Sequence, residues 1–277
     1  MIEPQGLSLV ARIIEAWRAR SLLVFFGHRA AEQIVSRTLL GYLWLVLRPG
    51  IPAAVMVFVF GFLIQVDTAV ETPYLIFFLL GLTAWNAFDS LLIWGTRGLY
   101  FNRSLLSKMY FPRLLVPIAS MFPGIMEFAI HAVFLIVALV GYVVLRGEYH
   151  AIFSIGVIWA AGALAAAFAL ATGLCLFTSL WDYQARDTRY TISVISRFLL
   201  YLTPVIYPST NIPEAYRVYY FVNPIAGIVE TFRYGVLGRL DLIPVGAFAY
   251  SCGFAALALL AGLIYFSIVE SSVIDRA

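Results

Sequence analysis

Four ionisable side chains stand inside long apolar stretches of the 277-residue chain: Asp89, Glu127, His131 and Arg197. Glu127 and His131 are four residues apart, so on a helix they share a face and could pair with each other. Such a pair could relay protons, but holding a helix bundle together is the favoured role. If these stretches cross a bilayer, each charge there costs about 2.5–3.5 kcal/mol on insertion scales. We therefore expect each of these side chains to face a partner or an aqueous path.

A second feature is "NRSLLSKMYFPRLLVP", residues 102–117, which lies between two apolar runs. It holds Arg103, Arg113 and Lys108, the only lysine of the chain, and it contains no acidic residue. Two interpretations are open. The stretch could be a basic loop that touches anionic lipid headgroups, or a short helix whose apolar side docks on a protein partner. The apolar residues between the charges favour the protein partner.

Several kinds of chemistry have no matching residues in the sequence. Lys108 follows Ser107 rather than glycine, so the G-x-x-x-x-G-K-[ST] phosphate loop is missing and ATP cannot bind in that way. The three histidines are far apart and the two cysteines, Cys175 and Cys252, stand in apolar runs, so no metal site is predicted. No G-x-S-x-G motif occurs. We expect no enzyme, no cofactor in this chain and no nucleic-acid partner.

The elements that position these residues are predicted to be membrane helices. The chain is 62% hydrophobic and 12% charged, whereas soluble domains carry roughly 25% charged residues. Several windows stay apolar for about 20 residues, the length that a helix needs to cross a bilayer. We expect one all-α integral membrane domain over residues 1–277, with six transmembrane helices at 42–66, 74–97, 116–145, 151–180, 190–206 and 246–269.

We expect no secretory signal peptide in the region 1–38, because its arginines are followed by only a short apolar patch. Apolar residues recur at helical spacing from Leu7 to Trp17, which predicts an amphipathic helix in the membrane interface. A soluble helix packed on another subunit is the alternative. With both termini cytoplasmic, thirteen of the 18 Lys and Arg residues lie on that side and four outside. This distribution follows the positive-inside rule.

The segment 208–244, between the last two spans, is expected on the outside. Ile225, Ile228, Val229 and Phe232 share one helical face there. Their helix has about 13 residues, too few to span a bilayer. The pattern predicts a re-entrant or surface-lying helix pair at the outer leaflet, with an ordinary extracellular loop helix as the alternative. Glu230 and Arg233 are expected near the outer headgroups, close enough to the surface for Glu230 to be reached from outside.

Aromatic residues are numerous along the second and fifth segments: Trp85, Phe88, Trp94, Tyr100, Tyr201 and Tyr207. Aromatic rings pack well on the C–H faces of sugars, so a sugar-conducting path would suit such a lining. Membrane proteins also carry aromatic belts at their interfaces. The belt is favoured for Tyr100 and Tyr207, while both interpretations stay open for Trp85 and Trp94.

Three blocks, in this order along the chain, resemble one family. The first is "SRTLLGYLWLVLRP" (36–49), and the second is "GLTAWNAFDSLLIWGTRGLYFNRSLLSKMYFPR" (81–113). The third comprises "RDTRYTISVISRFLLYLTPVIYP" (186–208) and "NPIAGIVETFRYGVLG" (223–238). Together they are similar to the permease subunits of ABC transporters that export polysaccharides, such as O-antigen, teichoic acid and capsule exporters. The family usually has neutral polar residues where this chain has Asp89 and Arg197.

The resemblance implies a homodimer with two separate ATPase subunits, which bind ATP and Mg²⁺. The implied cargo is a polysaccharide on a polyprenyl pyrophosphate carrier, moved outward across the inner membrane of a bacterium. An ABC exporter of drugs or lipids is one alternative, and a proton-coupled secondary transporter that uses Glu127 and His131 is another.

The resemblance also implies roles for particular residues. The loop 98–115 would carry a coupling helix that docks on the ATPase, with Asn102 as its N-cap and Pro112 at its end. The coupling residues would be Asn102, Leu105, Lys108, Met109, Phe111, Pro112 and Arg113. The substrate path would include Trp85, Asp89, Trp94, Arg97, Arg197 and Tyr201, with Asp89 as a candidate resting partner of Arg197. The outer gate would include Tyr207, Glu230 and Arg233.

Overall fold

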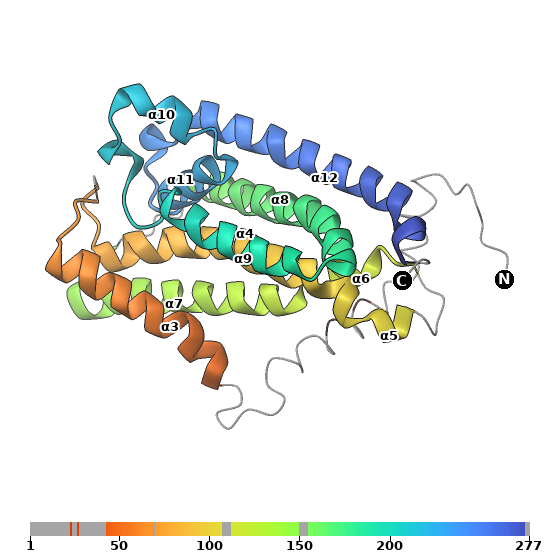
Figure 1. Ribbon diagram of the computed structural model, residues 1–277. Coiled ribbons are helices and arrows are strands. Elements are labelled where there is room, and N and C mark those ends of the chain that lie inside the picture. The colour runs from red at the N-terminus through yellow and green to blue at the C-terminus, as the bar shows by residue number, and fades with distance from the viewer. Residues whose placement is uncertain are drawn as a thin grey trace.

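The structure is a computed structural model that describes residues 43–68, 70–106, 112–149 and 155–274, together with Leu23 and Gly27. Every regular element in this part of the chain is a helix, so the expected all-α class is confirmed (Figure 1). The interface helix expected around Leu7 to Trp17 lies outside the described residues. The main elements are α3 (Leu43–Met56), η1 (Val57–Leu63), α4 (Tyr74–Phe101), α5 (Arg103–Leu106), α6 (Leu115–Ala119), α7 (Phe122–Arg146), α8 (Gly156–Gln184), α9 (Asp187–Tyr201), α10 (Glu214–Tyr220), α11 (Pro224–Val236) and α12 (Val245–Ile274).

Four stretches of the described chain are long and apolar enough to cross a membrane: Tyr74–Phe101, Leu115–Arg146, Gly156–Gln184 and Val245–Glu270. They correspond to four of the six predicted segments. In Figure 1 the long helices α4, α7, α8 and α12 run along the length of the molecule. α4 continues to Phe101, beyond the end of the predicted segment 74–97.

The first and fifth predicted segments are shorter as helices. α3 carries Pro49 and Pro52 within it and passes into the π-helix η1, so the first segment is not one regular α-helix. α9 has 15 residues, about 22 Å of helix against a hydrocarbon core of about 30 Å. α9 ends shortly before Pro204, because a proline disfavours the helical conformation of the residue that precedes it. The count of six spans therefore stays a prediction.

α4 is the central helix of the bundle. In its most apolar stretch 83% of the residues are buried, against 11% for Leu115–Arg146 and 17% for Val245–Glu270. Exposed side chains on these two outer helices are largely aliphatic, such as Val137, Leu145 and Ile268. Aliphatic surface of this kind suits contact with lipid chains, so α7 and α12 form the outer face of the bundle.

Small residues let α8 and α12 approach closely. A Cβ on Gly173 of α8 would collide with the backbone of Ala258 and Leu259 on α12. A Cβ on Gly262 would in turn collide with the carbonyl oxygen of Gly173. Ala258 and Gly262 are four residues apart, the spacing that brings small residues to one face in membrane helix pairs.

Within the segment 208–244, α11 is an interior helix. Asn223 is its N-cap and accepts at Oδ1 a hydrogen bond from the backbone N–H of Ile225 at 3.1 Å, and Pro224 occupies the first turn. Nearly all of α11 is buried, including the predicted apolar face. The helix is present, and its polar side also packs into the protein, so α11 itself does not lie on the surface. α10, the other helix of the pair, has no buried residue. A re-entrant arrangement of the pair stays a prediction.

The loop 98–115 is described only in part. Asn102 lies between α4 and α5. Its backbone oxygen accepts from the N–H of Leu106 at 3.1 Å, so it occupies the expected N-cap position before α5. Its side-chain Nδ2 donates back to the carbonyl of Gly98 at 2.9 Å, at the end of α4. The role of this segment in coupling stays a prediction. Pro112 accepts from the N–H of Leu115 at 3.1 Å and so opens the turn into α6. Lys108, Met109 and Phe111, and the side chain of Leu105, lie outside what the structure describes.

Candidate functional site

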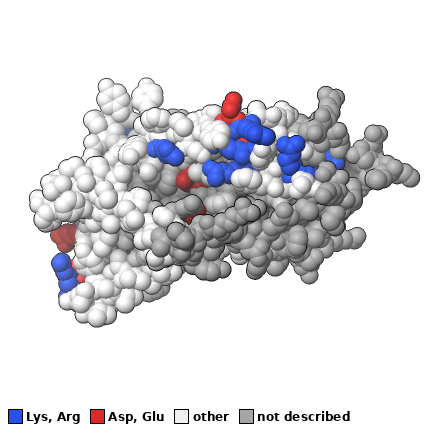
Figure 2. Space-filling model, turned by 60° about the horizontal axis from the view of Figure 1, so that its bottom comes forward, with Lys and Arg blue, Asp and Glu red and all other residues white. Residues whose placement is uncertain are grey.

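A polar cavity of about 540 Å³ lies among α3, α4, α7 and α9. All four ionisable side chains that the sequence placed within apolar stretches line it. The full lining consists of Pro49, Pro52, Ala53, Met56, Phe78, Leu82, Asn86, Asp89, Ser90, Glu127, His131, Arg197 and Leu200. Figure 2 shows acidic side chains set deep in the middle of one face, beside basic ones nearer the surface. The four side chains thus share one cavity, and the expected aqueous path stays a prediction.

Hydrogen bonds fix the α4 side of the cavity. The hydroxyl of Ser196 on α9 donates to Oδ1 of Asp89. One turn away, Ser90 Oγ donates to Asn86 Oδ1 at 3.1 Å, and Asn86 Nδ2 donates to the carbonyl of Leu82 at 3.0 Å. The polar groups are therefore held in place by their neighbours.

Glu127 and His131 do not pair through their side chains. The carboxylate of Glu127 accepts a hydrogen bond from Trp94 Nε1 at 3.2 Å, which links α7 to α4. His131 Nδ1 lies 2.8 Å from the backbone oxygen of Glu127. The predicted pair is wrong because each group has a better-placed partner, one across the helix interface and one along the backbone.

Arg197 lines the cavity with an exposed side chain. Asp89, its expected resting partner, accepts from Ser196 instead, and no ion pair between Arg197 and Asp89 occurs among the described residues. A neighbouring hydroxyl on the same helix reaches the carboxylate, so the arginine is left facing the opening.

The other predicted path residues lie apart from the cavity lining. Trp85 is buried in the core, with its ring centre 5.9 Å from that of Phe88. Tyr201 is 52% exposed at the end of α9. The guanidinium of Arg97 lies 5.9 Å from the ring centre of Trp94, so it borders the Glu127 side of the site.

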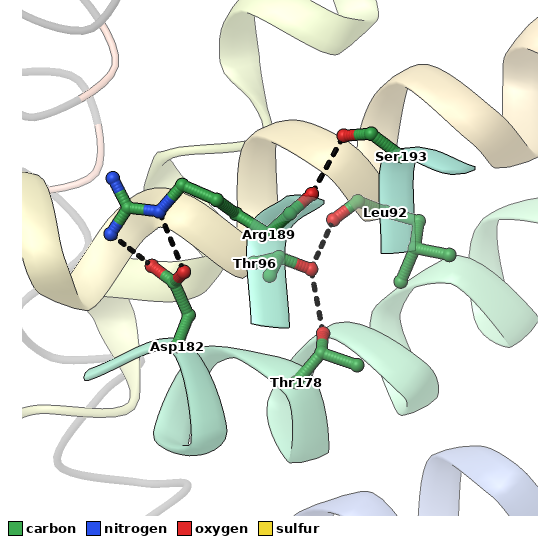
Figure 3. A network of polar contacts seen from close by, with 6 residues as sticks. All are labelled: Leu92, Thr96, Thr178, Asp182, Arg189 and Ser193. Atoms are coloured by element: carbon green, nitrogen blue, oxygen red, sulfur yellow. Dashed lines mark hydrogen bonds and ion pairs between the residues drawn. The ribbon is translucent and has the colours of Figure 1, made fainter. Parts of the chain in front are cut away.

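A second polar network lies at the α5 end of the bundle (Figure 3). Arg189 donates to both carboxylate oxygens of the buried Asp182, at 2.8 and 2.9 Å. Its guanidinium carbon is also 4.0 Å from the ring centre of Tyr100. Close by, the hydroxyls of Thr96 and Thr178 lie 2.6 Å apart and join α4 to α8.

This second network was not predicted from the sequence. Its signal was an acidic residue, Asp182, at the end of an apolar run with Arg189 seven residues later. Figure 2 shows a band of basic side chains from the middle of this face toward the α5 end. The side of the membrane on which this end lies stays a prediction.

At the opposite end, Glu230 and Arg233 are interior residues. Arg233 is fully buried and Glu230 is 2% exposed, so the Glu230 side chain is not open to the outside as expected. Their depth relative to the headgroups stays a prediction. Glu230 accepts from the backbone N–H of Ser209 at 3.0 Å. Tyr207 donates to the carbonyl of Tyr201 at 2.8 Å. Backbone groups around the turn after α9 need hydrogen-bond partners, and the side chains of Glu230 and Tyr207 supply them.

An exposed ion pair lies nearby, outside the bundle. Arg239 donates to Asp241 through two hydrogen bonds of 3.2 and 3.1 Å. The Arg239 side chain holds the pKa of the Asp241 carboxyl below its usual value. Both side chains face solvent, so this pair is a useful reference for the buried ones.

The chain is similar to known proteins over most of its length. Residues 22–237, more than half of the chain, match the family described as ABC-2 type transporter. The chain belongs to this family. Two similar proteins from Klebsiella pneumoniae are both named O-antigen export system permease protein RfbA, and each is 24% identical to this chain. One match covers 76% of this chain and 78% of that relative, and the other covers 78% and 82%.

Membership of the ABC-2 type transporter family gives the cavity its context. The chain is a membrane subunit of a transporter rather than a catalytic subunit, and the family implies an ATPase partner. No cluster of three or more His, Cys, Asp or Glu side chains in the described part of the chain could hold a metal ion. In this ABC-2 subunit the cavity of Asp89, Glu127, His131 and Arg197 is thus the candidate site for contact with cargo.

Proposed function

We propose that this chain is the permease subunit of an ATP-driven exporter that moves a lipid-linked polysaccharide across the cytoplasmic membrane of a bacterium. The observation that carries the proposal is a polar cavity enclosed by apolar helices in a member of the ABC-2 family. Similarity to two O-antigen export permeases over about three quarters of the chain supports a polysaccharide cargo. The carrier is a polyprenyl pyrophosphate, as the resemblance of the motifs implies.

The working unit is a homodimer. α9 borders the cavity, and its outward residues Tyr190, Phe198 and Tyr201 are 68%, 67% and 52% exposed. Large aromatic residues are frequent at protein interfaces. A second copy on this face would cover these rings and enclose a path between the two chains, with Arg197 beside it.

Two ATPase subunits supply the energy, and they bind ATP and Mg²⁺. They dock on the loop 98–115, at the end of the bundle that carries α5 and the basic band. Both chain termini lie on this cytoplasmic side. Tyr207, Glu230 and Arg233, at the other end, position the exit.

The test is genetic and biochemical. Deletion of the gene should abolish surface polysaccharide and leave its lipid-linked precursor inside the cell, and the tagged chain should co-purify with an ATPase as two copies of each. An ABC exporter of drugs or lipids predicts unchanged surface polysaccharide after deletion. A proton-coupled transporter predicts transport by the purified chain alone, driven by a pH gradient, and that result would contradict the proposal.

A further inference from the structure

The two sides of the polar cavity have different chemistry. Pro49, Pro52, Ala53 and Met56 of α3 form an apolar wall. The opposite wall, from α4 and α7, carries carboxylate, amide, hydroxyl and imidazole groups, on Asp89, Glu127, Asn86, Ser90 and His131. A volume of about 540 Å³ falls within the range of about 300–1,000 Å³ that is usual for small-molecule sites.

Hydrogen-bonding capacity remains on the polar wall. Asp89 accepts one hydrogen bond, from Ser196, and Glu127 accepts one, from Trp94. A carboxylate can accept about four hydrogen bonds, and the described residues supply no second one to either group. Asn86 uses one of its two amide hydrogens, on the carbonyl of Leu82. Acceptors and a donor are therefore free to bind a ligand that can both donate and accept.

The charges exclude an anionic occupant. Two carboxylates, Asp89 and Glu127, line the cavity, against one cationic lining residue, Arg197, whose side chain is exposed. A diphosphate placed between the two carboxylates would be repelled by both. Among the described residues, no group of three or more His, Cys, Asp or Glu side chains is placed to hold a metal ion here.

A hydrocarbon chain fits a different cavity. On another side of α3, a cavity of about 690 Å³ is lined only by apolar residues, including Val57, Leu75 and Phe134. An alkyl or isoprenoid chain gains from such a lining, but in the polar cavity it would leave the carboxylates without hydrogen-bond partners.

A sugar ring matches both walls. Its hydroxyls donate to carboxylates and accept from amides, and its C–H face packs on apolar side chains. We propose that the polar cavity binds one uncharged saccharide unit of the cargo, and that the charged group of the carrier stays outside it. This inference rests on the proposed polysaccharide export and adds the site at which the glycan is recognised.

Binding to the full-length chain in lipid nanodiscs tests the inference. The probe is a short oligosaccharide released by mild acid from the surface polysaccharide of the producing strain, and calorimetry measures its affinity. Glu127→Gln keeps the size of the side chain but removes a charged acceptor, so affinity should fall about tenfold. Asn86→Leu should weaken binding similarly. The matched control is Ser193→Ala on α9. The Ser193 hydroxyl donates to the Arg189 carbonyl at 2.7 Å, and Ser193 is not part of the cavity lining.

Inorganic pyrophosphate should not compete with the oligosaccharide. Competition by pyrophosphate, or oligosaccharide affinity that is unchanged in Glu127→Gln and Asn86→Leu, would overturn the inference. Absence of binding to the unmodified protein would overturn it as well. The deletion phenotype separates these failures from failure of the proposed export. If the deletion strain loses its surface polysaccharide, the proposed export function stands, whatever the cavity binds.

Discussion

Arg233 of α11 lies with its guanidinium carbon 3.8 Å from the ring centre of Phe77 on α4, and its Nε donates to the carbonyl of the same residue at 3.3 Å. Its Nη2 donates to the carbonyls of Pro204 and Val205, at 2.6 and 3.1 Å. A single buried side chain therefore ties α11 to α4 and to the turn that follows α9. A Cβ on Gly81 would collide with this guanidinium, so the absence of a side chain there makes the room.

Arg233→Gln should destabilise the outer end of the protein. Three buried carbonyls lose a charged donor, and a hydrogen bond to a charged group contributes about 1.5–3 kcal/mol. We expect a loss of at least about 2 kcal/mol, measured as the thermal unfolding midpoint in nanodiscs. Arg239→Gln is the control, because Arg239 is exposed and its side chain bonds Asp241 alone among the described residues. Equal midpoints for the two variants would show that Arg233 is not an anchor.

Gly173→Ala should separate α8 from α12. The added Cβ would collide with the backbone of Ala258 and Leu259, and overpacking of this kind costs about 1–3 kcal/mol. Gly253→Ala on α12 is the matched control, since its Cβ would meet nothing within 4 Å. There alanine should raise helix stability by up to about 1 kcal/mol. Opposite shifts in unfolding midpoint are expected, and a stabilised Gly173→Ala variant would refute the close packing.

Asp182 and Arg189 should be energetically coupled. Removing one partner leaves the other buried and unpaired, so Asp182→Asn or Arg189→Gln should each cost about 3–5 kcal/mol. The double variant should lose less than the sum, with a coupling energy of about 0.5–3 kcal/mol. The exposed pair of Arg239 and Asp241 should show little coupling in the same cycle. Additive losses at Asp182 and Arg189 would mean that the pair acts independently.

Arg197→Gln should leave abundance and ATPase assembly intact while lowering export. Arg197 is exposed at the cavity and has no ion pair with Asp89, so its loss should change stability by less than about 0.5 kcal/mol. Folded yield and export rate are measured together. If folded protein falls and adding Asp89→Asn restores it, the two residues form a structural pair in the assembled transporter and the cargo role is wrong.

Leu105→Ala combined with Phe111→Ala should uncouple export from ATP hydrolysis. These apolar residues belong to the proposed docking segment, and truncation of an interface hot spot typically costs about 2 kcal/mol or more. Membrane insertion should persist, whereas co-purification of the ATPase should weaken. Phe122→Ala is a control, because this exposed aromatic residue lies outside the segment. Unchanged co-purification and export in the double variant would remove the segment from the interface.

The sequence by itself determined the class of the protein. Long apolar windows with few charges can satisfy their backbone in a bilayer only as helices, so four membrane-capable helices and the short α11 were predictable from composition and periodicity. The rarity of charges in these windows also identified Asp89, Glu127, His131 and Arg197 as the residues of interest. Motif order was enough to indicate the family, which the match over residues 22–237 confirmed.

Only the tertiary structure decided the partners of these charges. Ser196 reaches Asp89, Trp94 reaches Glu127, and Arg189 reaches Asp182, each from another helix. Such contacts depend on the rotation and depth of each helix, which side-chain packing against neighbours sets and periodicity does not encode. Burial of Glu230 and Arg233 has the same origin, because an amphipathic pattern shows which face is apolar but not whether the polar face also finds carbonyl and N–H partners inside the protein.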